Sequence, residues 1–217
     1  MTLSYIDHIT ITAPNLEAGA EFVNRTLGVM PQRGGEHPRM GTHNLLLRLG
    51  DSLFLEVISP NPDAPRPDRP RWFALDGLAA DASPSLATWV VRTDDIHATA
   101  AKSSEALGPV ETMSRGMLNW LITIPADGSL PFGGVAPALI EWQAEPHPAA
   151  RLQDYGLSLA RLELFHSEPD RIAALLKSIG CQGPVSVSSI SKGMTPHLVA
   201  HIHTPGGLRI LKPFGAA

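Results

Sequence analysis

The stretch IDHITITAPNLEAGAEFV, residues 6–23, joins a strand pattern to a helix pattern and so decides the fold class. Side chains of different character alternate over residues 5–12, as in a β-strand whose successive side chains point to opposite faces. Asn15 then offers a helix cap, and apolar residues recur at helical spacing as far as Leu27. A strand that leads directly into an amphipathic helix predicts a mixed α+β fold.

A histidine stands in the middle of this strand, where a buried side chain is expected. Ile9 and Ile11 share one face of the strand. His8 lies on the other face, together with Ile6 and Thr10. Because the helix needs an apolar surface to pack on, we expect it to cover the Ile9 and Ile11 face. His8 is then predicted to point away from the helix.

The bulk composition is that of an ordinary globular protein. The chain has 217 residues, of which 43% are hydrophobic and 18% charged, and its formal net charge is −4. There is no basic and aromatic stripe that would indicate nucleic acid, and the single cysteine, Cys181, excludes an internal disulfide. We find no signal-peptide pattern and no apolar run of the roughly 20 residues that a membrane span needs. We expect a soluble, cytoplasmic protein without nucleic-acid or membrane partners.

The order strand, helix, strands occurs twice in residues 1–147. The first unit is 1–61 and the second is 84–147, and each begins with a strand that runs into a capped helix. The crossing between them, residues 60–83, starts with closely spaced prolines, which forbid a helix or an inner strand, so we expect it on the surface. The expected strands are 5–12, 44–50, 52–60, 85–93, 117–125 and 136–144, and the expected helices are 16–27 and 94–107.

A third unit, residues 152–217, has a similar order of elements but lacks candidate ligands. We expect a strand at 159–166, a helix at 167–180 and a hairpin over 197–213. An odd module leaves a sheet edge or an apolar face without a partner. We therefore expect a second copy of the chain to cover it, which makes a homodimer our hypothesis.

Two glutamates, Glu56 and Glu141, interrupt apolar strands in the sequences LFLEVI and ALIEW. Burying an unpaired carboxylate is costly or forces its protonation, so each glutamate needs a partner. Aligning the first strands and helices of the two units places Thr88 opposite His8. Aligning the two glutamate-containing strands places Glu141 opposite Glu56, at a shift along the chain that is nearly the same. Two shifts this close support a duplicated unit.

Three of these side chains could hold one divalent metal ion. His8, Glu56 and Glu141 supply one imidazole nitrogen and two carboxylates, a set that suits Zn, Fe, Mn, Ni or Co. An open position on the metal would then bind water or substrate. The alternative is that the glutamates are structural, either placed at strand edges or neutralised by arginines such as Arg48, Arg92 or Arg115.

Three segments resemble the vicinal oxygen chelate superfamily, in particular its glyoxalase-like branch: residues 6–28, 34–58 and 137–142. The resemblance implies tandem βαβββ modules that form one curled mixed sheet around a concave cleft, with the third unit as an extension. It also implies a divalent metal in the cleft, held by one residue on the first strand and one on the fourth strand of each module. At those positions this sequence has His8, Glu56 and Glu141, and also Thr88, which is a poor ligand.

The glycine-rich segment GGEHPRMGTHN, residues 34–44, is either a flexible turn between strands or a loop over the mouth of the cleft. The resemblance favours the second interpretation, because the glyoxalase-like branch has a similar segment. Arg39 would then bind a carboxylate or enolate oxygen of the substrate, and Asn44 would also contact the substrate. His37 would act as general acid or base, since the unperturbed pKa of histidine lies near neutrality.

Tryptophans and a histidine-rich strand complete the candidates. Three tryptophans could line an apolar pocket or pack in the core, namely Trp72, Trp120 and Trp142. We expect Trp120 to contact the substrate. Three histidines share one face of the strand 197–204, where a solvent-facing surface is a simpler interpretation than a second metal site; they are His197, His201 and His203.

Two functions compete at this point. The first is an enzyme that binds a small oxygenated substrate at a divalent metal and stabilises an enediolate-like anion, with Glu141 moving a proton. Such chemistry covers isomerases, lyases and dioxygenases. The second is a metal-free protein of the same fold that binds or sequesters a small molecule, an interpretation that Thr88 favours.

Overall fold

The structure, a computed structural model, describes residues 3–213 and contains the two βαβββ units that the sequence predicts. The first unit comprises β1 (Ser4–Thr12), α1 (Leu16–Leu27), β2 (Gln32–His37), β3 (Thr42–Arg48) and β4 (Phe54–Pro60). The second comprises β5 (Ser85–Thr93), α2 (Ile96–Lys102), β6 (Val110–Arg115), β7 (Leu118–Thr123) and β8 (Ala138–Trp142). The sequence pattern did not predict β6, and α2 ends earlier than expected.

The starts of both helices follow from their capping residues. The side chain of Asn15 accepts a hydrogen bond from the backbone N–H of Ala18, and Asp95 does the same for Ala98 at the start of α2. Gly28 ends α1 in the left-handed conformation, with a φ of 77°. None of the described helices is both long and apolar enough to cross a membrane.

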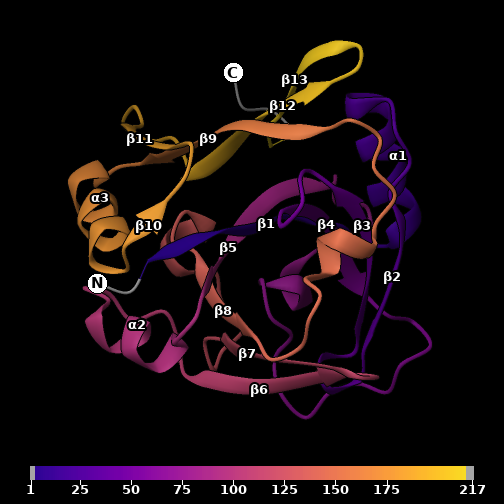
Figure 1. The fold of residues 1–217 in the computed structure, drawn as a ribbon, viewed down its shortest axis with the longest axis horizontal. Helices are drawn as coiled ribbons and strands as arrows, with labels where there is room; N and C mark the ends of the chain where they lie inside the picture. The colour runs from indigo at the N-terminus through magenta and orange to yellow at the C-terminus, as the bar shows by residue number, and fades with distance from the viewer. Residues whose placement is uncertain (1–2, 214–217) are drawn as a thin grey trace.

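The strands of the two units form one curled mixed sheet in the order β2-β3-β4-β1-β5-β8-β7-β6. β1 and β5 pair antiparallel at its centre, β4 runs parallel to β1, and β8 runs parallel to β5. The two units are therefore related by a pseudo-twofold axis between the central strands. Figure 1 shows the sheet wrapping around a hollow until its outer strands β2 and β6 approach each other. The α+β fold with a concave face is confirmed.

The pairing of the central strands confirms the first alignment of the two units. His8 pairs with Val90, and Thr10 pairs with Thr88. The shift along the chain from His8 to Thr88 equals the shift from Thr10 to Val90. If each residue is replaced by the residue at the same shift in the other strand, the pair His8–Val90 becomes the pair Thr88–Thr10, which is also present. Thr88 is therefore the structural counterpart of His8.

The pairing of the fourth strands corrects the second alignment. Glu56 on β4 pairs with Thr10, whose counterpart on the second central strand is Val90. Val90 pairs with Ala138 on β8. The counterpart of Glu56 is therefore Ala138 and not Glu141.

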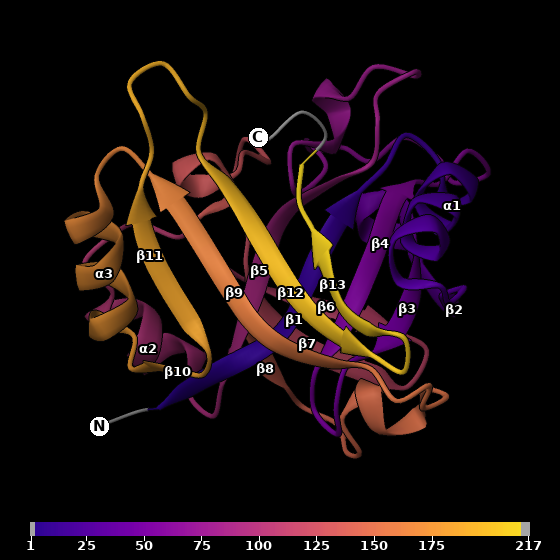
Figure 2. The same cartoon turned by 90° about the horizontal axis from the view of Figure 1, so that it is seen from above.

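The third unit forms a second sheet with a different topology. Its elements are β9 (Ser158–His166), α3 (Pro169–Ser178), β10 (Cys181–Gln182), β11 (Val185–Ser189), β12 (His197–Thr204) and β13 (Gly207–Leu211). β10 pairs with β1 of the main sheet, and the other strands have the order β11-β9-β12-β13, with β11 parallel to β9. Figure 2 shows this sheet lying across the central strands of the main sheet.

One apolar cluster joins the two sheets on the convex side of the main sheet. Ile9 and Ile11 pack there with Val23 of α1, as expected, and with Leu162 and Leu198 of the second sheet. The apolar face of the third unit is thus buried inside the chain. The homodimer was predicted because this apolar face was expected to lack a partner within the chain. The face has one, and the homodimer stays a prediction.

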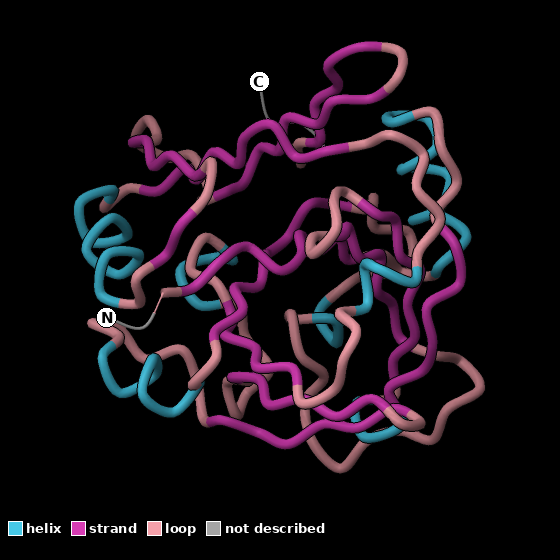
Figure 3. The backbone as a smooth tube through the Cα atoms, viewed as in Figure 1, coloured by secondary structure: helices cyan, strands magenta, loops and turns pink. Residues whose placement is uncertain are grey.

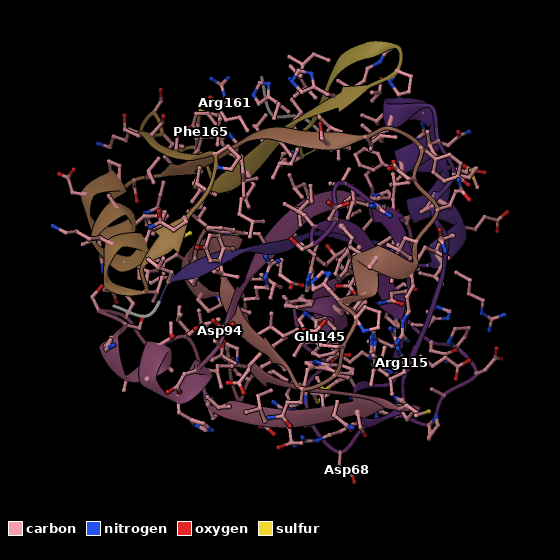
Figure 4. All side chains as sticks on the ribbon, viewed as in Figure 1. Asp68, Asp94, Arg115, Glu145, Arg161 and Phe165 are labelled. Atoms are coloured by element: carbon pink, nitrogen blue, oxygen red, sulfur yellow. The ribbon has the colours of Figure 1, made fainter. Side chains whose placement is uncertain are left out.

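The opposite face of the second sheet carries polar and aromatic side chains. Arg161 and Phe165, labelled in Figure 4, lie on β9 on the side away from the main sheet. His201 lies 2.5 Å from a carboxylate oxygen of Glu163, and His197 stacks on Phe165. These contacts fit the interpretation of the histidine-rich strand as a surface.

The crossing 60–83 differs from the expectation that it stays on the surface. Trp72 and Leu75 are 4% and 1% exposed, and they pack with Met40 and Ile58 in a second apolar cluster on the concave side. Figure 3 shows two short helical turns inside the outline of the strands, η2 (Leu75–Gly77) and η4 (Pro148–Arg151). Figure 2 places these turns at opposite ends of the curled sheet, so the crossing helps to close the hollow.

Candidate functional site

A pocket walled by tryptophans lies in the hollow, between the two units. Its cavity of about 30 Å³ has room for about one or two water molecules. The pocket contains five polar side chains, namely His8, His37, Asn44, Glu56 and Arg115. Its largest apolar walls are Phe54, Trp72, Phe73, Trp120 and Trp142. The structure thus brings together five residues that the sequence singled out for metal binding, catalysis or substrate contact: His8, His37, Asn44, Glu56 and Trp120.

A β-bulge in β1 places Asp7 beside His8. The pairing register with β5 shifts between Ile6 and His8, so Ile6 packs on the convex side, opposite to what strict alternation predicted. Asp7 is 0% exposed, and it accepts a hydrogen bond of 2.6 Å from Nδ1 of His8. Its other oxygen accepts hydrogen bonds of 2.9 Å from Nε1 of Trp142 and from Nε2 of His147.

These donors keep Asp7 charged. Burial raises the pKa of the Asp7 carboxyl, but the hydrogen bonds from His147 and His8 outweigh burial and hold the pKa well below its usual range. The carboxylate in turn fixes the His8 ring, because Nδ1 donates to Asp7 and Nε2 is left to face the pocket. The ring of Phe54 stacks on His8 at 4.6 Å and holds its plane.

The carboxylate of Glu56 is buried opposite His8, with 5% of the residue exposed. One oxygen accepts a hydrogen bond of 2.6 Å from Nδ2 of Asn44, and the other lies 3.6 Å from Nε2 of His8. The side-chain oxygen of Asn44 accepts hydrogen bonds from the backbone N–H of Gly35 and from Arg115. Asn44 therefore lies in the pocket, but its amide holds Glu56 and Arg115 in place.

Arg115 is the cation of the pocket, a role that the sequence assigned to Arg39. Arg115 ends β6 and packs against Gly35 of β2, where a β-carbon would come within 2.8 Å of its Cδ (Figure 4). Burial lowers the pKa of the guanidinium, and the charge of Glu56 opposes this effect. The pocket therefore has a cation next to its carboxylate.

Arg39 does not line the pocket. Its side chain is 48% exposed and donates hydrogen bonds to the backbone oxygen of Thr112 and to Glu111. Glu111 also pairs with Arg69 of the crossing at 2.8 Å. These contacts tie the first unit to β6 at the seam of the curled sheet, so Arg39 holds the seam closed and does not reach a ligand in the pocket.

His37 lies in the pocket as expected, but its ring is neutral. Its Nδ1 is 3.1 Å from the hydroxyl oxygen of Thr42, and the rings of Trp72 and Trp120 meet it edge-on. Burial and, secondarily, the charge of Arg115 lower the pKa of His37 to about 3. The expectation of a pKa near neutrality therefore does not hold, and His37 can donate or accept hydrogen bonds without carrying a charge.

Glu141 does not reach the pocket. Ile140 and Trp142 both line it, and because side chains alternate along a strand, Glu141 between them points to the opposite face. Its carboxylate accepts a hydrogen bond of 2.8 Å from the backbone N–H of Ile96, the first residue of α2. The structure therefore does not bring Glu141 to His8, and the predicted metal-ligand and proton-transfer roles have no geometric basis.

The metal-ligand set expected from the resemblance is thus incomplete. His8 and Glu56 come together, but Glu141 lies on the other face of the sheet and Thr88 offers only a hydroxyl. Among residues 3–213, no group of three or more histidine, cysteine, aspartate or glutamate side chains could hold a metal ion. The residues present do not fit the predicted three-ligand site.

Two residues of this site, Asp7 and His147, were not predicted from the sequence, and Arg115 was named only as a possible partner of the glutamates. Asp7 had a visible signal, because an acidic residue inside an apolar strand needs a partner, the same reasoning that singled out Glu56. Arg115 lies on a strand that was not predicted. His147 lies in the loop after β8, where no periodic pattern marks it.

The curled sheet of two βαβββ units with a site in its hollow is the fold of the vicinal oxygen chelate superfamily. Residues 6–180 match the family model described as a glyoxalase-like domain, and the chain belongs to this family.

Comparisons with solved structures give the following similarities. A hypothetical protein from Staphylococcus aureus is similar with a TM-score of 0.59 and 13% identity, over 87% of each chain. A methylmalonyl-CoA epimerase variant from Streptomyces coelicolor has a TM-score of 0.45 and 22% identity, over 65% of this chain and 99% of that one. A variant of 4-hydroxymandelate synthase from the same organism has a TM-score of 0.45 and 17% identity, over 95% of this chain and 61% of that one. No curated protein sequence matches significantly.

Proposed function

We propose that the protein is an enzyme that removes a proton next to the carbonyl group of a small carboxylate. One observation carries this proposal: a continuous chain of polar contacts runs from Asp7 through His8, Glu56 and Asn44 to Arg115, inside an apolar pocket. Buried charged groups are costly, and a set of them that faces a cavity is typical of a functional site.

Glu56 is suited to act as the base. Asn44 holds one carboxylate oxygen, and the other faces His8 across 3.6 Å. This free oxygen would take a proton from the carbon next to the carbonyl, and the electron pair of the broken C–H bond would form the enolate. The proton could pass to Nε2 of His8, because Asp7 stabilises the imidazolium that results.

Two other side chains of the pocket, Arg115 and His37, are suited to bind the anion. The Arg115 guanidinium would bind the carboxylate or the enolate oxygen, since charge-assisted hydrogen bonds to such oxygens are strong in a closed site. The neutral His37 ring would donate a hydrogen bond to the carbonyl oxygen without protonating it. Proton removal of this kind is common to isomerases and lyases. The three predicted metal ligands do not meet, so the proposed steps use only these side chains.

The test uses 2-oxocarboxylates from pyruvate to 2-oxohexanoate, dissolved in D₂O with the full-length protein. Proton removal at C3 followed by return of a deuteron from solvent gives a loss of the C3 proton signal in NMR. We expect the protein to accelerate this loss for at least one acid. Arg115→Gln should weaken binding at least about tenfold, because a charge-assisted bidentate contact is lost. Arg39→Gln is the matched control and should leave binding unchanged, since Arg39 lies outside the pocket.

A second candidate function is binding without conversion. Two observations favour it. The His37 ring is neutral, and the counterpart of Glu56 in the second unit is Ala138. Among the described residues, Glu56 is therefore the only carboxylate that lines the pocket. The same experiment separates the two functions. Binding of an acid without exchange at C3 would support a sequestering protein, and failure of every acid to bind would overturn both proposals.

A further inference from the structure

A chamber lies on the other side of the pseudo-twofold axis, around the positions that correspond to His8 and Glu56 in the pocket. Thr88 and Ala138 line this chamber, and they are the counterparts of His8 and Glu56. The pseudo-twofold axis of the fold therefore relates the two cavities. We call the first the reactive pocket and the second, which also includes Ile124 and Leu130, the apolar chamber.

The chemistry of the apolar chamber is opposite to that of the reactive pocket. Apart from the hydroxyls of Thr88, Thr123 and Ser129, its lining is aliphatic, aromatic or proline, and none of the described residues that line it is charged. The Thr123 hydroxyl already accepts a hydrogen bond from the backbone N–H of Leu139. A small cavity with this lining favours hydrocarbon over water.

The two cavities share one boundary, formed by Trp72 and Phe73. Both side chains line both cavities, and their rings stack on each other at 5.5 Å. Nε1 of Trp72 is buried and has no hydrogen-bond partner among the described residues. Nearly all buried donors in proteins are paired, so a donor left open at a cavity boundary indicates a missing acceptor.

The backbone at this boundary is strained. Phe73 and the following Ala74 have φ values of 57° and 53°, a left-handed conformation that costs residues with a side chain about 1–2 kcal/mol. Strain of this kind concentrates at ligand clamps and moving segments. The cavities measure about 30 Å³ and 10 Å³, whereas ligand sites usually exceed about 300 Å³. A ligand of ordinary size therefore needs the cavities to widen, and the boundary that they share is the strained segment between them.

We infer that the apolar chamber is a subsite for the apolar group of the substrate and opens when the Phe73 side chain moves aside. The inference rests on the proposed function, because it takes the reactive pocket as the place where the oxygenated group binds. It defines the substrate class as a small amphipathic molecule, with a carboxylate and carbonyl at one end and a hydrocarbon chain at the other. Nε1 of Trp72 donates a hydrogen bond to an oxygen at the junction.

The experiment measures the Kd of pyruvate, 2-oxobutanoate, 2-oxopentanoate and 2-oxohexanoate by tryptophan fluorescence. Each added methylene should tighten binding by about threefold to fourfold, so that 2-oxohexanoate binds tens of times more tightly than pyruvate. Ala138→Leu fills the chamber and should reduce this ratio to a few-fold. Ala126→Leu makes the same change at an exposed loop position and should leave the ratio as it is.

A second variant keeps the inference testable if Ala138→Leu folds poorly. Phe73→Ala removes the boundary side chain and should speed the association of 2-oxohexanoate at least about threefold. An unchanged association rate would overturn the role of Phe73. A Kd that does not fall with the chain length of the acid would overturn the subsite, and so would equal weakening of all four acids by Ala138→Leu. In both cases the proposed function would stand as long as pyruvate binds. Failure of all four acids to bind would overturn both.

Discussion

The two halves of the curled sheet have the same strand pairing and opposite chemistry. In the first half, the central strand and its parallel neighbour carry His8 and Glu56. At the same positions, the second half carries Thr88 and Ala138. The comparison shows that the fold supplies equivalent positions on both sides of its axis, whereas the side chains decide which side is reactive.

What permits charge at His8 and Glu56 is a set of partners that Thr88 and Ala138 lack. Asp7 and Asn44 hydrogen-bond the imidazole and the carboxylate, and Arg115 supplies a compensating charge. Around Ala138 the lining is apolar. If this description is correct, the same acidic side chain should be essential in one half and harmful in the other.

The largest effect is expected from removing the carboxylate of the first half. Glu56→Gln keeps the size of the side chain but removes the base, so C3 proton exchange should fall at least about 100-fold. Glu141→Gln is the matched control and should change exchange less than about twofold, because Glu141 contacts α2 on the other face. Equal losses in the two variants, measured by NMR, would contradict the placement of the site.

The next largest effect is expected from adding a carboxylate to the second half. Ala138→Glu would bury a charge without a partner and should lower the free energy of unfolding by about 2–4 kcal/mol. Ala126→Glu, at an exposed position, should change it by less than about 0.5 kcal/mol. Urea denaturation followed by fluorescence measures both. A stable Ala138→Glu variant would mean that the apolar chamber can solvate a charge.

Local sequence patterns predicted most of the fold and half of the site. The alternation of residues 8–11 and the spacing of apolar residues up to Leu27 depend on neighbours in the chain, and both predictions are confirmed, whereas Ile6 lies on the face opposite to the predicted one. His8 and Glu56 were found because a polar residue inside an apolar strand needs a partner. No such pattern marks β6, whose polar sequence resembles a loop, so Arg115 could be named as a possible partner of the glutamates but not placed in the pocket.

The error at Glu141 has a different cause. The sequence separation between Glu56 and Glu141 differs from that between His8 and Thr88 by an odd number of residues. Because side chains alternate along a strand, an odd difference places the side chain on the other face of the sheet. The residues on either side of Glu141 have the right parity to line the pocket. The bulge that turns Asp7 toward the imidazole is a tertiary effect, which single-strand alternation does not contain.

A medium effect is expected from pH, because the first half also buries a neutral histidine. The pKa of His37 is lowered from 6.5 to about 3, so the unfolded chain binds more protons than the folded chain between these values. Stability is therefore full above about pH 6.5 and falls as the pH drops toward 3. From pH 7.5 to pH 5, His37 should cost about 2 kcal/mol of unfolding free energy.

His37→Gln should remove most of this pH dependence in urea denaturation, whereas His203→Gln, at an exposed position, should retain it. Asp7 does not contribute in this range: its pKa is depressed, so its stabilisation is present above its unfolded pKa near 3.9 and is lost only at lower pH. Burial lowers the pKa of His43 as well, so a small dependence of the same sign should remain in His37→Gln.

The smallest effect concerns the boundary between the two halves. Ala74→Gly should relieve the left-handed strain at φ 53° and raise the melting temperature by about 1–3 °C, although glycine gains entropy in the unfolded chain. Ala80 is an exposed residue of the same crossing and has no positive φ, so for Ala80→Gly only the entropy effect remains and the melting temperature should fall by a similar amount. Opposite signs for the same substitution at two positions of one crossing would show that the boundary stores strain. If both variants lowered the melting temperature, the backbone at the Trp72–Phe73 boundary would not be strained. Ligand entry would then need a route other than movement of this boundary.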